Sequence, residues 1–273
     1  MPRLTSLVHC LALCLVFLLA MPLAATAAQA QPVERLGVVL LHDKNAFPEK
    51  SMAEMARVLR NVGFQVICPE LPWSKKRGFD ATFQQALVEI GLAAQELRVD
   101  GCTQVALVGH GLGANAALGF AASRSGVFAI VALAPSHDPE RYREVFMPDV
   151  RKARNLIVTA GGTARSLFMD VNQDKDYDLS TTAEVYLSYN DPDGAAVMPR
   201  SCAALKGPLP LLWVVGSKDP LSYLGRSYAY AKAPEHPMSR YEEVSADHVH
   251  VPSAAAKLVA EWLRALVENP GGT

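Results

Sequence analysis

The sequence lacks an excess of charge of either sign. Its 26 lysines and arginines nearly balance 27 aspartates and glutamates, so the formal net charge is −1. Neither a surface for nucleic acid nor a polybasic membrane anchor is therefore expected. With 273 residues, half of them hydrophobic, the chain is long enough to bury one substantial core. We expect a single folded domain, and any ligand or partner must be inferred from local motifs.

Long apolar runs are absent after the N-terminus, so no later segment is expected to cross a membrane. At the N-terminus, Arg3 precedes an apolar run over 7–20, and small residues lead to Ala28-Gln29-Ala30. This arrangement is typical of a cleaved secretory signal peptide, and the run is short for a membrane anchor. We predict a signal peptide at 1–30 and a mature protein at 31–273. That protein should be secreted or periplasmic, with no membrane contact after cleavage.

Cysteine is scarce and odd in number beyond the signal peptide, where Cys68, Cys102 and Cys202 remain. Cys68 ends one predicted strand and Cys102 precedes another, whereas bridged α-carbons must lie within about 7 Å. We therefore expect three small buried hydrophobic side chains. Pairing through Cys202 stays open, without support.

Short apolar runs alternate with helical patterns along the mature chain. Strands are predicted at 37–42, 65–68, 105–108, 128–133, 211–215 and 241–244, and helices at 51–61, 82–97, 113–123 and 254–267. Ser51 is the expected cap of the first helix, and Gly63 follows its end. The alternation predicts a mostly parallel sheet with helices on both faces. The polar, irregular stretch at about 139–208 is interpreted as a small cap inserted over the carboxyl ends of the strands.

A serine is missing at the most informative motif. Val108-Gly109-His110-Gly111-Leu112-Gly113 joins a predicted strand to a helix, which is the context of the G-x-S-x-G turn that displays a nucleophile. The central residue is Gly111, which has no oxygen to attack a carbonyl. A dinucleotide-binding loop needs a third glycine where Ala114 stands, and a phosphate-binding loop needs Gly-Lys-Ser/Thr. Both alternatives fit poorly, and we expect no cofactor.

Five motifs in order make the mature chain resemble the α/β-hydrolase family. They are Leu40-Leu41-His42, the segment 63–72, the turn at 108–114, the strand and loop at 210–220, and Ser245-Ala246-Asp247-His248. The resemblance implies an α/β-hydrolase fold and a triad in the chain order nucleophile, acid, histidine. It also implies relatedness to carboxylic ester and acyl hydrolases, with a small-molecule ester or acyl ligand.

Carried over by the resemblance, Asp219 is the catalytic acid and His248 the base, with His250 as the alternative base. Gly111 is then a degenerate nucleophile position. The acid would hold the imidazole in one tautomer and stabilise its protonated form. Alternatively, Asp219 only caps the next turn and His248 is a loop residue, but the matched context favours the pair.

The oxyanion hole implied by the resemblance uses backbone N–H groups near Lys44 and at Leu112. The family's glycine after His42 is Asp43 here. A carboxylate at that position would bring negative charge near a developing oxyanion, which is unfavourable. His42 and His110 flank the expected pocket and are interpreted as structural.

Several other residues are considered for a role in binding or catalysis. Trp73, Tyr186 and Tyr189 either line a substrate pocket under the cap or pack between cap and core. Ser136 follows the strand after the turn, and as a displaced nucleophile it would lie one strand over.

Two patterns raise the question of metal binding. His248-Val249-His250 has chelate spacing but no evident third ligand, so no metal site is expected. The run Asp170–Asp178 begins like a calcium loop, but Lys175 replaces its glycine and Thr181 its last acid. A solvated acidic loop is favoured over weak calcium binding.

Three functional hypotheses follow. In the first, Asp219 and His248 activate a water or a substrate proton directly in the room left by Gly111, giving weak or unorthodox hydrolase activity. In the second, the protein is a non-catalytic pseudohydrolase that binds an apolar or acyl ligand. In the third, it is an interaction module of the cell envelope with a vestigial pocket.

Overall fold

A computed structural model of the protein describes residues 35–172 and 175–269; the predicted signal peptide lies outside these residues. Six parallel strands form the main sheet in the order β2-β1-β3-β4-β7-β8. The strands are β1 (Leu36–Leu41), β2 (Gln65–Ile67), β3 (Gln104–His110), β4 (Ala129–Leu133), β7 (Leu211–Gly216) and β8 (Arg240–Val244). The predicted parallel sheet is confirmed, because each of these strands overlaps a strand predicted from the sequence.

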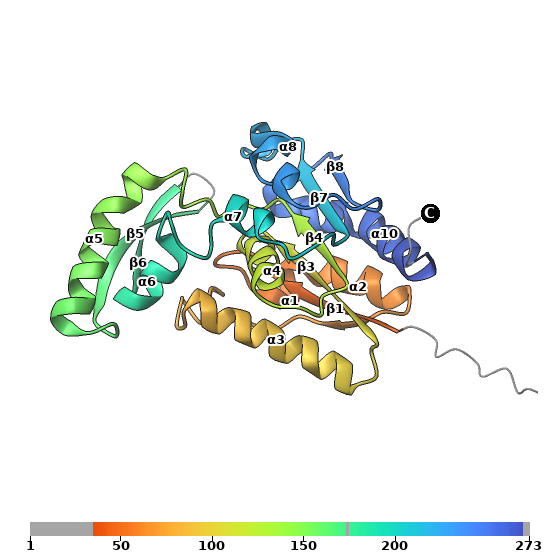
Figure 1. The fold of residues 1–273 in the computed structure, drawn as a ribbon, viewed down its shortest axis with the longest axis horizontal. Helices are drawn as coiled ribbons and strands as arrows, with labels where there is room; N and C mark the ends of the chain where they lie inside the picture. The colour runs from red at the N-terminus through yellow and green to blue at the C-terminus, as the bar shows by residue number, and fades with distance from the viewer. Residues whose placement is uncertain (1–34, 173–174, 270–273) are drawn as a thin grey trace, which may run out of the picture. The chain divides into compact units, whose positions relative to one another are not determined.

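Helices cover both faces of this sheet (Figure 1). Alternate residues of β1 point to opposite faces. Val39 and Leu41 pack with α3 (Phe83–Val99) and α4 (Leu112–Ser123), whereas Val38 and Leu40 pack with α2 (Ala53–Asn61), α9 (Val251–Ala254) and α10 (Ala256–Glu268). Two hydrophobic cores therefore sandwich the sheet and fix the loops at its strand ends.

Local signals hold in some places and fail in others. Thr82 caps α3 with a full capping box, in which Gln85 bonds back to the cap residue. The prediction that Ser51 caps the next helix is wrong. Ser51 is the last residue of the short helix α1 (Pro48–Ser51), and its hydroxyl donates to the carbonyl of Phe47. Because α2 begins only at Ala53, after a turn at Met52, the Ser51 hydroxyl bonds to the preceding turn of chain and not to the first N–H groups of α2.

The three described cysteines are free thiols. Cys102 and Cys202 are buried, as expected for small hydrophobic side chains, and Cys68 is half-buried. Their environments suit packing rather than redox chemistry, because burial raises the pKa of both Cys68 and Cys202 to about 12.

The segment between β4 and β7 is more regular than its sequence indicates. It contains α5 (Arg143–Ala160), the antiparallel pair β5 (Arg165–Asn172) and β6 (Lys175–Thr182), α6 (Ala183–Asn190) and α7 (Met198–Ala203). The helices α5 and α6 group with the β5–β6 pair (Figure 1). Shorter pieces follow β7: the single turns η1 (Ser222–Leu224) and η2 (Tyr230–Lys232) flank α8 (Gly225–Tyr228), and η3 (His248–His250) follows β8. Among the described helices, none is both long and apolar enough to span a bilayer.

A buried ion pair ties β5 to the loop after β1. The ammonium of Lys44 lies 3.0 and 3.1 Å from the two carboxylate oxygens of Asp170 and donates to the carbonyl of Val171 at 2.8 Å. The side chains of Lys44 and Asp170 are 5% and 0% exposed, so Asp170 is not a solvated residue of an acidic loop. Gln173 and Asp174 of the proposed calcium loop lie outside the described residues.

Lys44→Met is expected to destabilise the fold by about 3 kcal/mol, because it leaves the Asp170 carboxylate buried without its cation. Denaturant unfolding of the mature protein measures this loss. Lys257→Met is the matched control, since Lys257 and Glu261 form an exposed pair that contributes less than about 1 kcal/mol. An equal loss of unfolding free energy in the two variants would show that the buried Lys44–Asp170 ion pair does not stabilise the fold.

Candidate active site

The turn between β3 and α4 has the shape of a nucleophile elbow. Gly111 adopts φ 55° and ψ −121°, in a region that side-chain-bearing residues rarely visit. Gly109 and Gly113 are equally constrained, because a β-carbon on Gly109 would overlap the carbonyl of Gly113, and one on Gly113 the carbonyl of Leu41. The backbone of the motif is thus built to raise residue 111 above the sheet.

The space in front of Gly111 is filled by Asp43, which follows β1. A β-carbon on Gly111 would overlap Oδ1 of the Asp43 carboxylate. The expectation that Gly111 leaves room for a water is therefore wrong. The Asp43 side chain, from the loop after the neighbouring strand β1, thus occupies the space where a side chain on residue 111 would lie.

The Asp43 carboxylate makes two close polar contacts, one with each of its oxygens. Its Oδ1 accepts the backbone N–H of Leu112 at 2.9 Å, at the N-terminus of α4, where free N–H groups favour negative charge. Its Oδ2 lies 3.0 Å from Nε2 of His248. The predicted oxyanion donor Leu112 is thus occupied by a carboxylate of the protein itself.

His248 is held from its other side by Asp219. Its Nδ1 lies 2.7 Å from Oδ2 of Asp219, whose Oδ1 accepts the N–H of Leu221. Asp219 follows β7 and His248 follows β8, and these strands are neighbours in the sheet. The structure therefore brings together Asp43, His248 and Asp219 in one buried row.

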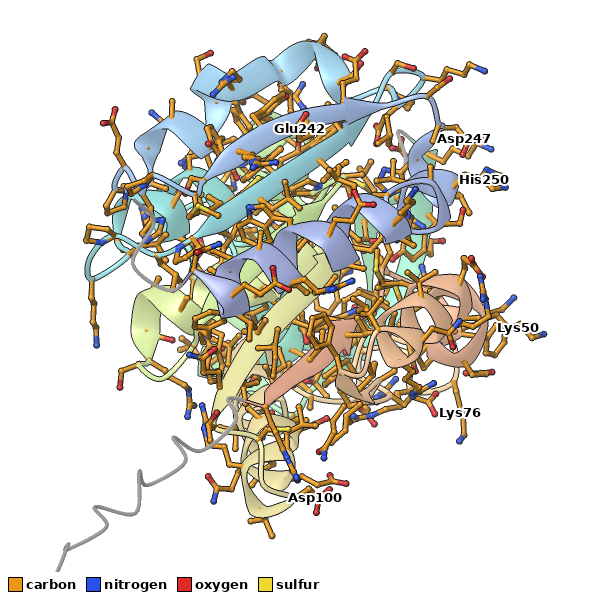
Figure 2. The ribbon with its side chains drawn as sticks, turned by 90° about the vertical axis from the view of Figure 1, so that its right-hand side faces the viewer. Lys50, Lys76, Asp100, Glu242, Asp247 and His250 are labelled. Atoms are coloured by element: carbon orange, nitrogen blue, oxygen red, sulfur yellow. The ribbon has the colours of Figure 1, made fainter. Side chains whose placement is uncertain are left out.

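His250, the alternative base, points away from this row. It is exposed and pairs with Asp247, with 2.6 Å between its Nδ1 and the Oδ1 of Asp247. Figure 2 shows both side chains at the surface. Because η3 is a helical turn, residues 248 and 250 diverge, and they do not form the chelating pair that a strand would give.

The charges in the row stabilise one another. Burial alone would lower the pKa of His248, but hydrogen bonds and charge from Asp219 and Asp43 outweigh it and raise that pKa to about 10. Burial acts to raise the pKa of Asp43, yet His248, His110 and the Leu112 N–H hold it below its usual range. One imidazolium is thus shared between two carboxylates.

His42 and His110 hold the backbone around the row in place. This agrees with the interpretation of both residues as structural. Nε2 of His42 accepts the N–H of Leu71 at 3.1 Å, so its Nδ1 donates to the carbonyl of Asp43 at 2.8 Å. Nε2 of His110 lies 3.0 Å from the carbonyl of His248, to which it donates. Burial lowers the pKa of His42 and brings that of His110 to about 4, which favours the neutral form of both rings.

The predicted substrate-binding aromatics are packed into the core. Trp73, Tyr186 and Tyr189 are at most 1% exposed. The Trp73 indole donates to the carbonyl of His42, and the two tyrosine hydroxyls donate to the carbonyls of Met169 and Ala81. Of the two roles considered for them, the structure shows packing between the insertion and the core.

Two small cavities lie beside the loops that carry the row. Ser136 lines a cavity of about 20 Å³ and Asp219 another of about 20 Å³. Asp43, His248 and Asp219 are each at most 5% exposed. A larger groove of about 580 Å³ lies beside Leu211, Arg226 and His236 and contains none of the three. The row is therefore buried from solvent.

Comparison with known proteins shows the family to which the chain belongs. The sequence profile described as "Alpha/beta hydrolase family" matches residues 38–262. The chain belongs to that family. No curated protein matches the chain in sequence. The matched span includes Asp43, Gly111, Asp219 and His248.

Solved structures show the same fold at low sequence identity. A monoacylglycerol lipase from Paleococcus ferrophilus has a TM-score of 0.63 and 19% identity, over 84% of this chain and 94% of that one. Est1E from Butyrivibrio proteoclasticus, with ferulic acid bound, has a TM-score of 0.57 and 16% identity, over 87% and 92% of the two chains. A putative hydrolase from Agrobacterium vitis has a TM-score of 0.58 and 17% identity, over 85% and 88%.

Proposed function

We propose that the protein is a hydrolase whose nucleophile is the carboxylate of Asp43, assisted by His248 and Asp219. One observation carries this proposal. The Asp43 carboxylate fills the space of the missing elbow side chain while touching both the histidine and the oxyanion-hole N–H. A carboxylate is an accepted nucleophile in enzymes that proceed through a covalent ester.

The position of Asp43 favours attack on a saturated carbon over attack on an acyl group. Acyl transfer needs N–H donors for the substrate's own oxyanion, and the Leu112 N–H is already bonded to Asp43. Displacement at a saturated carbon forms no oxyanion on the substrate carbonyl. The proposed substrate is an epoxide, whose leaving oxygen needs the proton that His248 shares with Asp43.

The proposed reaction balances in two steps. In the first, Oδ2 of Asp43 forms a bond to the epoxide carbon, the ring C–O bond breaks, and the alkoxide takes the proton from His248. In the second, neutral His248 takes a proton from water as the water oxygen bonds to Cγ of Asp43. The oxyanion then forms on Oδ1, where the Leu112 N–H already donates. Collapse breaks the Cγ–Oδ2 bond, and His248 protonates the leaving diol. The Asp43 carboxylic acid then gives the second water proton to His248, which restores the carboxylate and the imidazolium of the starting state.

A second candidate function rests on the closure of the site. The row is buried, and the cavities beside it hold about 20 Å³ each, far less than the space of a small-molecule site. A pseudohydrolase whose old nucleophile position is sealed by an internal ion pair would look the same. We further propose that the mature protein works outside the cytoplasm, on the strength of the signal-peptide pattern at 1–30.

Hydrolysis of styrene oxide to its diol separates the two candidates. The wild-type mature protein is expected to turn over, and both Asp43→Asn and His248→Gln are expected to lose at least about 10²-fold in rate. His250→Gln is the control and should keep the wild-type rate, because His250 faces solvent. Absence of turnover in the wild type would favour the pseudohydrolase. Turnover unaffected by Asp43→Asn would exclude Asp43 as the nucleophile.

A further inference from the structure

His110, which the proposed reaction does not use, is buried next to Asp43 and His248 and offers a further ring nitrogen. Asp43, His110 and His248 each offer one oxygen or nitrogen, and these three atoms lie within 4.8 Å of one another. The three side chains come from the loop after β1, the end of β3 and η3. All three are at most 4% exposed. Three different segments of the fold thus converge on one small volume.

Each of these side chains is fixed by a contact at its other polar atom. Nδ1 of His248 is held by Asp219, Nε2 of His110 by the carbonyl of His248, and Oδ1 of Asp43 by the N–H of Leu112. Metal-bound histidines are oriented in this way, with the second ring nitrogen donating to a carboxylate or a carbonyl. Nδ1 of His110 is left over, together with Nε2 of His248 and Oδ2 of Asp43, which bond to each other. A metal ion at these three atoms would displace the proton that His248 and Asp43 share.

Nδ1 of His110 is the unexplained atom of the site. It is buried and has no hydrogen-bond partner. With the ring proton on Nε2, Nδ1 carries a bare lone pair. A buried acceptor without a donor costs about 1–3 kcal/mol, which nothing in the hydrolase chemistry requires. A cation is the partner that a lone pair beside a carboxylate suits best.

We propose that Nδ1 of His110, Nε2 of His248 and Oδ2 of Asp43 form a binding site for Zn²⁺. Two imidazoles and one carboxylate are a common zinc ligand set, with a fourth position left for water. Bond lengths of about 2.0–2.2 Å place tetrahedral ligand atoms about 3.3 Å apart. The separation of His248 and Asp43 is 3.0 Å, so the pair needs to open only slightly.

This site goes beyond the proposed function and does not depend on it. The ion would take the Oδ2 lone pair with which Asp43 attacks, so zinc binding and the carboxylate reaction exclude each other. Zinc would then act as an inhibitor of the row.

Metal titration of the mature protein, after removal of bound metal with a chelator, tests the site. We expect saturable binding of one Zn²⁺ by calorimetry, and a visible absorption band of tetrahedral type with Co²⁺. His110→Gln keeps a donor at the Nε2 position but removes Nδ1, and should weaken zinc binding at least about 10-fold. His250→Gln is the control and should bind like the wild type.

Two outcomes would overturn the site. One is the absence of saturable zinc binding by folded wild-type protein, shown by its thermal melt. The other is undiminished binding in His110→Gln, which would place the ion elsewhere. If His110→Gln does not fold, Asp43→Asn takes its place, since replacing the carboxylate by an amide is expected to weaken binding by a similar factor. Zinc binding is measured without substrate, so its failure is distinct from a failure of the hydrolase.

Discussion

The double variant Asp43→Gly/Gly111→Ser is expected to become a serine hydrolase, whereas neither single variant does. The glycine introduced at position 43 would free the space in front of the elbow and release the N–H of Leu112. The hydroxyl introduced at position 111 would then face Nε2 of His248, whose Nδ1 already lies 2.7 Å from Asp219. Hydrolysis of 4-nitrophenyl acetate should rise at least about 10³-fold over the wild type, and a fluorophosphonate probe should label the new serine.

The two single variants are the controls for this exchange. Gly111→Ser alone puts a β-carbon into the Asp43 carboxylate and a side chain at φ 55°, so a loss of about 1–3 kcal/mol of stability is expected. Asp43→Gly alone opens the site but supplies no nucleophile. Labelling of Gly111→Ser alone would show that Asp43 does not fill that space. A folded but unlabelled double variant would show that the rest of the site no longer supports acyl transfer.

The inner part of the sheet was predictable because β1, β3, β4 and β7 are buried on both faces. Such strands are continuous apolar runs, as in Val38-Val39-Leu40-Leu41. The insertion was not predictable in the same way. In α5 the buried residues are Phe146, Val150 and Ala153, a narrow stripe interrupted by Pro148. These residues recur at helical spacing, but a proline inside such a pattern ordinarily ends or kinks a helix, so the sequence favours an irregular segment.

The site residues that belong to a sequence motif were predictable. The residue whose role depends on filling a vacated volume was not. Asp219 and His248 follow strand-end motifs, and parallel neighbouring strands bring such loops together. Sequence alone marks Asp43 only as an unfavourable charge. Its role depends on the volume vacated at Gly111, far along the chain, and no local pattern reports that. The sequence offered one indication: both Asp43 and Gly111 differ from the residues that the family pattern has at these positions.

The most direct test of the account asks whether Asp43 becomes covalently bonded to substrate. The mature protein, in excess over styrene oxide, is allowed one turnover in H₂¹⁸O and then digested with trypsin. Because water attacks Cγ of the Asp43 ester, the heavy oxygen should appear in the peptide Leu36–Lys44, in the carboxylate of Asp43. The diol from this turnover should carry only ordinary oxygen. Heavy oxygen in the diol, with none in the peptide, would contradict the proposed nucleophile.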